Sequence, residues 1–308
     1  MILKGVSCHR YYPNPDARPS GDEDILIDWR DYRKCDNLLK ENGYICEDEF
    51  DPDKVQDERE AHYRAANGTL YLEVHLNAIG RENQRQQRLK DSFDDALDHV
   101  VTVESEGHHF TVLEPTYQIM HLLSHFYRHL YESGVGIRQM LDVLLTVKAE
   151  ADKIDWKIIE EFLRETQMRK IFAAVLNAGL KYFHMDLVCV PEKLWNRKVD
   201  PEPMLEDMID VGIYGYGEKG ERKLSSNFTL DIDTKHNNLL TIVFPPRQRL
   251  ADRYPVLHKH PGRYLIYVVV RWLELLKEHG ADEASRERLK ASVETGKKRR
   301  NILEQYKD

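Results

Sequence analysis

The stretch GDEDILID, residues 21–28, changes abruptly from acidic to apolar after a loop that contains proline and asparagine. Its aliphatic residues 25–27 predict a buried β-strand. Side chains two positions apart on a strand point to the same side of a sheet, so Asp22 and Asp24 are expected to face one way. Two carboxylates fixed on one face repel each other, and a divalent cation that prefers oxygen ligands relieves the repulsion. The stretch therefore predicts a cation site at the mouth of a strand.

A third carboxylate, Glu73, lies in the strongest hairpin signal of the chain, HYRAANGTLYLEVHLN at residues 62–77. Asn67-Gly68 predicts a type I′ turn, in which both residues have positive φ. On the second strand apolar and polar residues alternate, which places Glu73 and His75 on the polar face. If a neighbouring strand brings Glu73 beside the two aspartates, three carboxylates and two metal ions form a clamp suited to phosphoryl displacement. The alternative is that the aspartate pair and the glutamate are ordinary solvated surface residues.

Composition restricts the class of protein. The chain has 308 residues, 41% of them hydrophobic, which suits a globular protein of two domains. A formal net charge of -8 argues against a protein that coats nucleic acid. The four cysteines have no Cys-x-x-Cys spacing and no secretory signal opens the sequence, so we expect a cytoplasmic protein without a zinc ribbon. The longest apolar stretch, residues 264–276, is too short to span a bilayer and is expected to be a buried helix or strand.

The order of the predicted elements indicates an α+β fold. The first part of the chain is expected to hold a helix at residues 30–43 and short strands at residues 2–6, 23–28 and 44–46. After about residue 105 apolar residues recur with the period of an α-helix, with Thr116 and Asp155 as candidate N-caps. The expected helices cover residues 114–134, 137–151, 155–167 and 169–185, and a further long helix follows Pro261. We predict a small mixed-sheet head over residues 1–104 and a mainly helical domain over residues 105–308 that closes the cleft.

The motifs and their order resemble a known superfamily. LKGVSCHRYYPNPDARPSGDEDILID, followed by YLEVH, resembles the nucleotidyltransferase superfamily related to DNA polymerase beta. The nearest resemblance is to a family of uncharacterised bacterial nucleotidyltransferases that share LKG…YP…R…GDIDLLV…GY…EVH. The segments HLLSHFYRHLYESGVGIRQMLDV (121–143) and FPPRQRLADRYPVLHKHP (244–261) also resemble this family, so the resemblance covers most of the chain.

The resemblance implies a function and a set of residues. The protein is expected to move a nucleoside monophosphate from an NTP such as ATP to an acceptor hydroxyl of a small molecule, sugar, protein or RNA end, with release of pyrophosphate. Catalysis and binding of Mg²⁺, or of Mn²⁺, are expected of Asp22, Asp24 and Glu73. Gly5 is expected to let the backbone approach the triphosphate closely. The full set expected to bind nucleotide is Lys4, Gly5, Ser7, Arg18, His125, His129, Arg138 and Asp142.

The sequence departs from the family pattern at three points. Glu23 stands between the aspartates where the family has an apolar residue, Ser7 is offset from the usual Gly-Gly or Gly-Ser position, and the sequence starts directly at the first strand. Glu23 and the abrupt start suit a second interpretation, a non-catalytic nucleotide-binding or scaffold protein on the same fold. A third interpretation, a toxin-like enzyme that modifies tRNA, is disfavoured by the acidic net charge.

Several residues of the helical part have two interpretations. Arg18 could contact phosphate or form a salt bridge within its loop. Arg138, at the start of a helix, could bind phosphate oxygens or pair with Asp142 four residues later. Three histidines at i, i+4 and i+8, beginning at His121, could bind zinc, but a helix packed against its neighbours through hydrogen-bonded histidines is the simpler interpretation.

Overall fold

The computed structural model describes residues 1–48, 55, 60–68, 70–77, 89, 91–105, 107–132, 134–195, 198–211, 244–245, 247–254, 256–279 and 297–308. The chain divides into two compact units. The first, unit 1, comprises Met1–Tyr127, Ile137–Leu205 and Tyr306–Asp308; the second, unit 2, comprises Arg128–Gly136 and Glu206–Gln305. The predicted α+β class with a small mixed sheet is confirmed. The predicted domain boundary at residues 104–105 falls inside unit 1 and stays a prediction.

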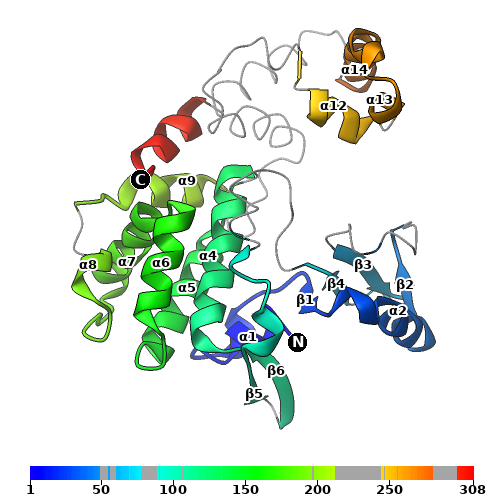
Figure 1. The fold of residues 1–308 in the computed structure, drawn as a ribbon. Helices are drawn as coiled ribbons and strands as arrows, with labels where there is room; N and C mark the ends of the chain where they lie inside the picture. The colour runs from blue at the N-terminus through cyan, green and yellow to red at the C-terminus, as the bar shows by residue number, and fades with distance from the viewer. Residues whose placement is uncertain are drawn as a thin grey trace. The chain divides into compact units, whose positions relative to one another are not determined.

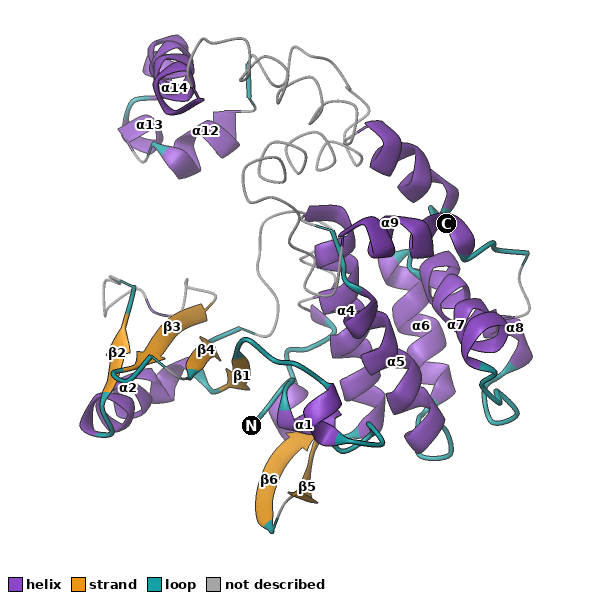
Figure 2. Cartoon of the chain, turned by 180° about the vertical axis from the view of Figure 1, so that it is seen from behind, coloured by secondary structure: helices purple, strands orange, loops and turns teal. Residues whose placement is uncertain are grey.

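Unit 1 contains a four-stranded sheet with the order β1-β4-β3-β2 (Figures 1 and 2). The strands are β1 (Glu23–Leu26), β2 (Tyr44–Cys46), β3 (Glu60–Ala65) and β4 (Tyr71–His75). Strand β1 pairs with β4 in parallel, whereas β2, β3 and β4 are antiparallel neighbours. The strands predicted within residues 23–28 and at 44–46 are confirmed. The neighbour of β1 in the sheet is β4, which lies far from it in the sequence.

The strand predicted at residues 2–6 is largely absent. Ile2 forms two isolated bridges, to Ile25 and to Val112, and the Leu3 amide donates to the Asp24 carbonyl oxygen at 2.8 Å. At Gly5 the backbone has a φ of 65°, a conformation that glycine adopts readily, and helix α1 (Val6–His9) begins. The prediction was wrong because the glycine turns the chain away from β1 after three residues.

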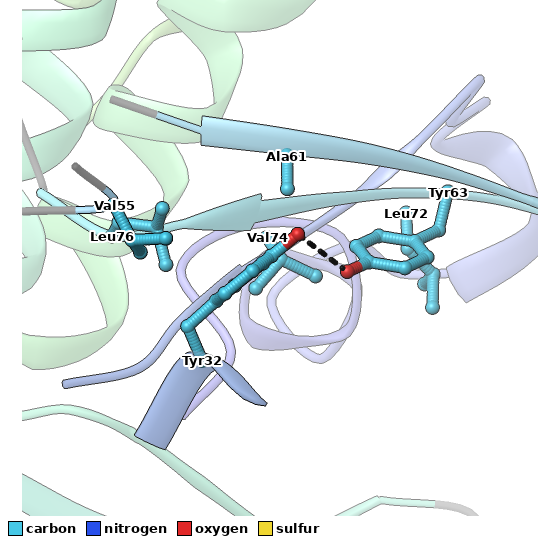
Figure 3. Close-up of a cluster of buried hydrophobic side chains, with 7 residues drawn as sticks. All are labelled: Tyr32, Val55, Ala61, Tyr63, Leu72, Val74 and Leu76. Carbon is cyan, nitrogen blue, oxygen red and sulfur yellow. Dashed lines mark hydrogen bonds between the residues drawn. The ribbon is translucent and has the colours of Figure 1, made fainter. Parts of the chain in front are cut away.

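One face of the sheet packs against helix α2 (Tyr32–Glu41) (Figure 3). Tyr63 is fully buried, and its hydroxyl donates to Asp36 Oδ1 at 2.9 Å and lies 3.4 Å from the Tyr32 hydroxyl. The helix predicted at residues 30–43 is confirmed, and Gly43 with a φ of 82° follows its end. The buried cluster on this face consists of Tyr32, Val55, Ala61, Tyr63, Leu72, Val74 and Leu76.

The hairpin of β3 and β4 is confirmed, but its predicted type I′ turn is not. Gly68 has a φ of 72°, while Asn67 is not among the described residues with positive φ. The Gly68 amide donates to the Ala65 carbonyl at 2.7 Å, and the Ala65 amide donates to the Leu70 carbonyl at 2.9 Å. The turn is therefore longer than two residues, and only its glycine takes the left-handed conformation.

A second hairpin and a group of helices complete the described part of unit 1. Strands β5 (Val100–Ser105) and β6 (His108–Leu113), which the sequence did not reveal, form a two-stranded sheet. The four predicted helices are present, and they lie side by side (Figures 1 and 2). Asp155 caps the third, accepting from two backbone amides, whereas Thr116 Oγ1 accepts from the Asp155 amide instead of capping its own helix. The helices are α4 (Pro115–Glu132), α5 (Ile137–Glu150), α6 (Trp156–Thr166) and α7 (Arg169–Phe183).

Unit 2 contains the long helix predicted after Pro261, which is α14 (Tyr264–His279). Leu250, Leu257 and Val268 belong to a buried apolar cluster. The expectation that residues 264–276 are buried is wrong for one face of this helix, because Leu265, Ile266, Val269 and Leu273 are each more than half exposed. Among the described residues no helix combines the length and the apolar character needed to cross a membrane.

Further helices and turns are described. Residues 297–305 are helical. The others are α8 (Glu192–Trp195), α9 (Glu202–Val211), α12 (Arg247–Arg253), α13 (Val256–Lys259) and the 3₁₀ turns η1 (Pro15–Ala17), η2 (Trp29–Asp31), η4 (Ala96–Asp98) and η6 (Pro261–Arg263).

Candidate functional site

The second face of the sheet carries carboxylates and imidazoles on adjacent strands. The parallel register places Asp24 of β1 opposite Glu73 of β4, and the antiparallel register places Glu60 and His62 of β3 opposite His75 and Glu73. Because alternate residues of a strand share a face, these side chains project to the same side of the sheet. Asp24, Glu73 and His75 each offer one ligand atom, and these atoms all lie within 4.8 Å of one another.

Asp24 is the most buried member of this group, with 1% of its surface exposed. Its Oδ2 lies 2.8 Å from Nζ of Lys4, and its Oδ1 lies 2.9 Å from Nε2 of His75. Burial alone would raise the pKa of Asp24, but the ammonium of Lys4 and the hydrogen bond from His75 outweigh it and hold the pKa below its ordinary value. Asp24 is therefore a carboxylate, fixed by two protein groups.

Glu73 has a different environment although it is the register partner of Asp24. Its Oε2 lies 3.8 Å from Nε2 of His75, and 22% of its side chain is exposed. Burial, followed by the negative charges of Asp24 and Asp22, raises the pKa of Glu73 to about 7. The negative charge of the site is thus incompletely compensated at neutral pH.

Asp22 lies just before β1 and is half-buried. Its backbone oxygen accepts a hydrogen bond from Ser20 Oγ at 2.8 Å. Its charge contributes to the raised pKa of Glu73, although Asp22 does not belong to the group of three ligand residues found among the described residues. The predicted trio of carboxylates is therefore electrostatically connected, and the ligand role of Asp22 stays a prediction.

His75 was placed on the polar face from sequence but was given no role, and Glu60 was missed. His75 is 2% exposed, and its Nδ1 lies 3.5 Å from Glu60 Oε2. Glu60 lies two residues before the start of the predicted hairpin at His62, and β3 in fact begins at Glu60, so extending the alternation back by two residues places it on the face of His62. The neighbouring His62 has another partner, with its Nδ1 2.9 Å from Asp48 Oδ2.

Gly5 and Glu23 meet at the start of β1, and Glu23 alternates along the strand with Asp24. A Cβ atom at Gly5 would lie 1.7 Å from Glu23 Oε2, so only glycine admits this carboxylate without displacement. The Val6 amide donates to the same oxygen at 3.4 Å. Burial raises the pKa of Glu23, although the Val6 amide favours its ionised form. The close approach that was expected for a triphosphate is made here by Glu23, and nucleotide binding by Gly5 stays a prediction.

Two further expected nucleotide-binding residues face the protein interior. Lys4 Nζ lies 2.8 Å from His125 Nε2 as well as from Asp24, so α4 and the start of the chain meet at the carboxylate. Ser7 is 1% exposed, and its hydroxyl donates to the Leu3 carbonyl at 3.0 Å. The structure thus brings Lys4 and His125 to the site, whereas the Ser7 hydroxyl has a local backbone partner.

Arg18 and Asp142 form a buried bidentate pair. Arg18 Nε donates to Asp142 Oδ1 at 2.8 Å, and its Nη2 donates to Oδ2 at 2.8 Å. The Tyr12 hydroxyl also donates to Oδ1 at 2.8 Å. Arg18 is 2% exposed and Asp142 is 3% exposed. Arg18 therefore forms a salt bridge, but to helix α5 and not within its own loop. A contact of either residue with nucleotide stays a prediction.

The second interpretation of Arg138, a pair with Asp142 four residues later, is wrong. Within the described chain Arg138 Nη1 donates to the Pro19 carbonyl at 3.0 Å, and the carboxylate of Asp142 is bound by Arg18. The i, i+4 pair is replaced because Arg18 offers two parallel hydrogen bonds. His129 belongs to unit 2, and its role stays a prediction.

The donor set suits a divalent cation. Two carboxylates and an imidazole lie within mutual reach of one small ion, and one of the carboxylates has a pKa raised by its negative neighbours. A cation would relieve that repulsion.

Comparison with known proteins gives one match. A family model described as an uncharacterised nucleotidyltransferase matches residues 1–180, which is more than half of the chain. No curated protein and no solved structure matches the chain.

Proposed function

The chain belongs to this family of uncharacterised nucleotidyltransferases, and we propose that it transfers a nucleoside monophosphate from an NTP to an acceptor hydroxyl. The acceptor is a small molecule, a sugar, a protein side chain or an RNA end. The observation that carries the proposal is the parallel pairing of β1 with β4, which sets Asp24 opposite Glu73. Two carboxylates from strands far apart in sequence meet at one position, as the expected chemistry requires.

The reaction forms one bond to phosphorus and breaks another. The acceptor oxygen attacks the α-phosphorus, the bond from that phosphorus to the α–β bridging oxygen breaks, and pyrophosphate leaves. Glu73 accepts the proton of the acceptor hydroxyl as the general base. Asp24, held by Lys4 and His75, keeps its charge and orientation throughout.

Mg²⁺, held by Asp22, Asp24 and Glu73, would neutralise charge on the phosphates and lower the pKa of the attacking hydroxyl. Lys4 and His125 contribute to a polar wall beside Asp24, and Lys4 supplies a positive charge there. Arg138, whose Nη1 donates to the Pro19 carbonyl, retains further donors for phosphate oxygens.

The proposal is tested with a variant that carries Asp22→Asn and Asp24→Asn. The protein is incubated with Mg²⁺, each labelled NTP and a cell extract, and both pyrophosphate release and the labelled fraction are measured. The variant should lose at least about 1,000-fold in transfer because several kcal/mol of transition-state stabilisation disappear. Asp31→Asn, which changes an exposed aspartate outside the site, is the matched control. Full transfer by the folded double variant contradicts the proposal.

A second candidate function is a nucleotide-binding protein without turnover. It is favoured by the contacts of Asp24, both of whose oxygens already face protein groups, and by the position of Glu23 against Gly5. Magnesium-dependent NTP binding in a titration, without release of pyrophosphate in the presence of extract, distinguishes this candidate from the transferase.

A further inference from the structure

His75 is the one imidazole among the three residues that form the described ligand group. Carboxylate ligands alone suit Mg²⁺ and Ca²⁺, whereas an imidazole nitrogen favours first-row transition ions. The identity of the third ligand therefore bears on which metal the site selects.

The distances around His75 match those between ligands of one ion. Its Nε2 lies 2.9 Å from Asp24 Oδ1 and 3.8 Å from Glu73 Oε2. Two ligand atoms that are each about 2.1 Å from a metal lie roughly 3 to 4 Å apart for angles between about 90° and 140°. Both distances fall in this range, so a single ion could contact all three side chains with small displacements.

The other nitrogen of His75 lies beside a carboxylate. A ligating histidine usually donates its second N–H to a carboxylate, which fixes the tautomer and the orientation of the ring. Here Nδ1 faces Glu60 Oε2 at 3.5 Å, and both residues come from adjacent strands in direct register. A small approach of Glu60 would let it accept the Nδ1 proton, which leaves the Nε2 lone pair for an ion that also contacts Asp24 and Glu73.

Lys4 contacts only one of the two carboxylate oxygens of Asp24. The ammonium lies 2.8 Å from Oδ2, while Oδ1 is the atom that faces His75. An ion could bind Oδ1 in place of the hydrogen bond from His75 while Lys4 remains at Oδ2. The two cations would then share one carboxylate.

We propose that His75 binds a divalent transition ion together with Asp24 and Glu73, with Glu60 as its positioning residue, so that the site prefers Mn²⁺ to Mg²⁺. This inference rests on the proposed function, because it concerns the same carboxylates. The inference adds an imidazole ligand, His75, and a preference for a transition ion. A site of three carboxylates implies neither.

Binding of Mn²⁺ to the whole chain, without nucleotide, tests the proposal. Calorimetry gives the Mn²⁺ and Mg²⁺ affinities, and pulsed EPR of the Mn²⁺ protein detects nitrogen coupling from an imidazole ligand. The wild type should bind Mn²⁺ at least about tenfold more tightly than Mg²⁺ and show the nitrogen coupling. His75→Gln should lose the coupling and about tenfold or more of its Mn²⁺ affinity, with a smaller change for Mg²⁺.

His62→Gln is the matched control, because His62 lies on the adjacent strand and the same face but has its Nδ1 on Asp48. It should retain the nitrogen coupling and the Mn²⁺ affinity. Glu60→Gln should retain the coupling and lose roughly tenfold in affinity. Thermal unfolding confirms that each variant is folded.

Two results overturn the inference: absence of nitrogen coupling in the wild type, or Mn²⁺ affinity in folded His75→Gln within about twofold of the wild type. Failure of the proposed function is a separate outcome. In that case Mn²⁺ binds with His75-dependent nitrogen coupling, but no NTP yields pyrophosphate with either metal in the presence of extract.

Discussion

The two faces of the four-stranded sheet are built from alternate residues of the same strands, yet burial has opposite consequences on them. On one face Tyr63 and Val74 are completely buried, and their apolar surface is stabilised by leaving water. On the other face Asp24 and His75 are almost as deeply buried, and each must find a charged or polar partner. The apolar side chains of the first face need no further partner. The second face retains a carboxylate, Glu73, whose negative charge is not fully balanced by neighbouring positive groups.

The difference shows where function can reside in this fold. The apolar face contributes stability through volume and area, so its side chains are replaceable by others of similar size. The polar face contributes little net stability, because desolvation of charges offsets their attraction. A charged side chain that adds little to the stability of the fold, but whose position is fixed by several strands, is a candidate catalytic or ligand-binding residue.

The largest effect on stability is expected on the apolar face, for Tyr63→Ala. It leaves a cavity between the sheet and α2, so we expect a loss of about 3 to 5 kcal/mol in the free energy of unfolding, measured by urea denaturation. Tyr71→Ala, on the same hairpin but the polar face, is the control and should change it by about 1 kcal/mol or less. Equal losses in the two variants would break the comparison between the faces.

Lys4→Met tests whether the buried charges of the polar face are mutually dependent. Removing the ammonium leaves Asp24 without its charged partner, so the free energy of unfolding should fall by about 3 kcal/mol at pH 7 with a chelator present. Lys40→Met removes a similar contact to Asp36 on the exposed surface of α2 and should change stability by less than about 1 kcal/mol. A small effect at Lys4 would show that His75 alone compensates Asp24.

Glu73→Gln sharpens the comparison through pH. The folded pKa of about 7 lies above the ordinary 4.5, so the stabilising contribution of protonated Glu73 is fully present below pH 4.5 and is lost as pH rises through 7. Without divalent ions, wild-type stability should decline over this range by up to about 3 kcal/mol from this group.

The glutamine variant should lack this part of the decline and be the more stable protein at pH 8. Denaturant midpoints measured between pH 4 and pH 8 provide the check. Glu41→Gln, at an exposed position on α2, is the control and should follow the wild-type profile. Parallel pH profiles for wild type and Glu73→Gln would contradict the prediction.

Gly5→Ala gives the smallest effect, at the end of the sheet where β1 meets α1. An alanine at φ 65° and ψ -115° lies outside the allowed left-handed helical region and costs about 1 to 3 kcal/mol, and its Cβ must also displace the Glu23 carboxylate. Combining it with Glu23→Ala should remove the steric part of the loss but leave the backbone part. A double-mutant cycle by urea denaturation separates the two, and complete recovery in the double variant would show that the backbone conformation is not strained.

The spacing of apolar residues predicted most of the fold, because a strand or helix that buries one face carries apolar residues at the period of that element. The alternation of Leu72 and Val74 with Glu73 and His75 identified the hairpin and its polar face. The strand at residues 2–6 was predicted wrongly because an apolar run does not show where Gly5 turns the chain. The exposed face of α14 was missed because a continuous apolar run indicates length and not which side is covered.

The site could be predicted only in part, because local spacing does not show which distant residues come into contact. Residue spacing placed Asp22 and Asp24 at the mouth of a strand, the alternation in the hairpin placed Glu73 on its polar face, and the resemblance joined the three as metal ligands. The spacing did not show that Lys4 and His75 hold Asp24 or that Arg18 binds Asp142, because these contacts join residues up to 124 positions apart. Pairing between distant residues is decided by the tertiary structure, and a single sequence does not record it.

The order of the strands has a consequence for how the protein acquires its site. Strands β3 and β4 are close in sequence and can associate early, whereas β1 reaches β4 only after a loop of about fifty residues has closed, which is slower. Asp24 and Glu73 therefore meet late, when the edge strand docks. A nascent or partly unfolded chain would have a hairpin but no cation site, so metal binding should report on completion of the native sheet rather than on its early formation.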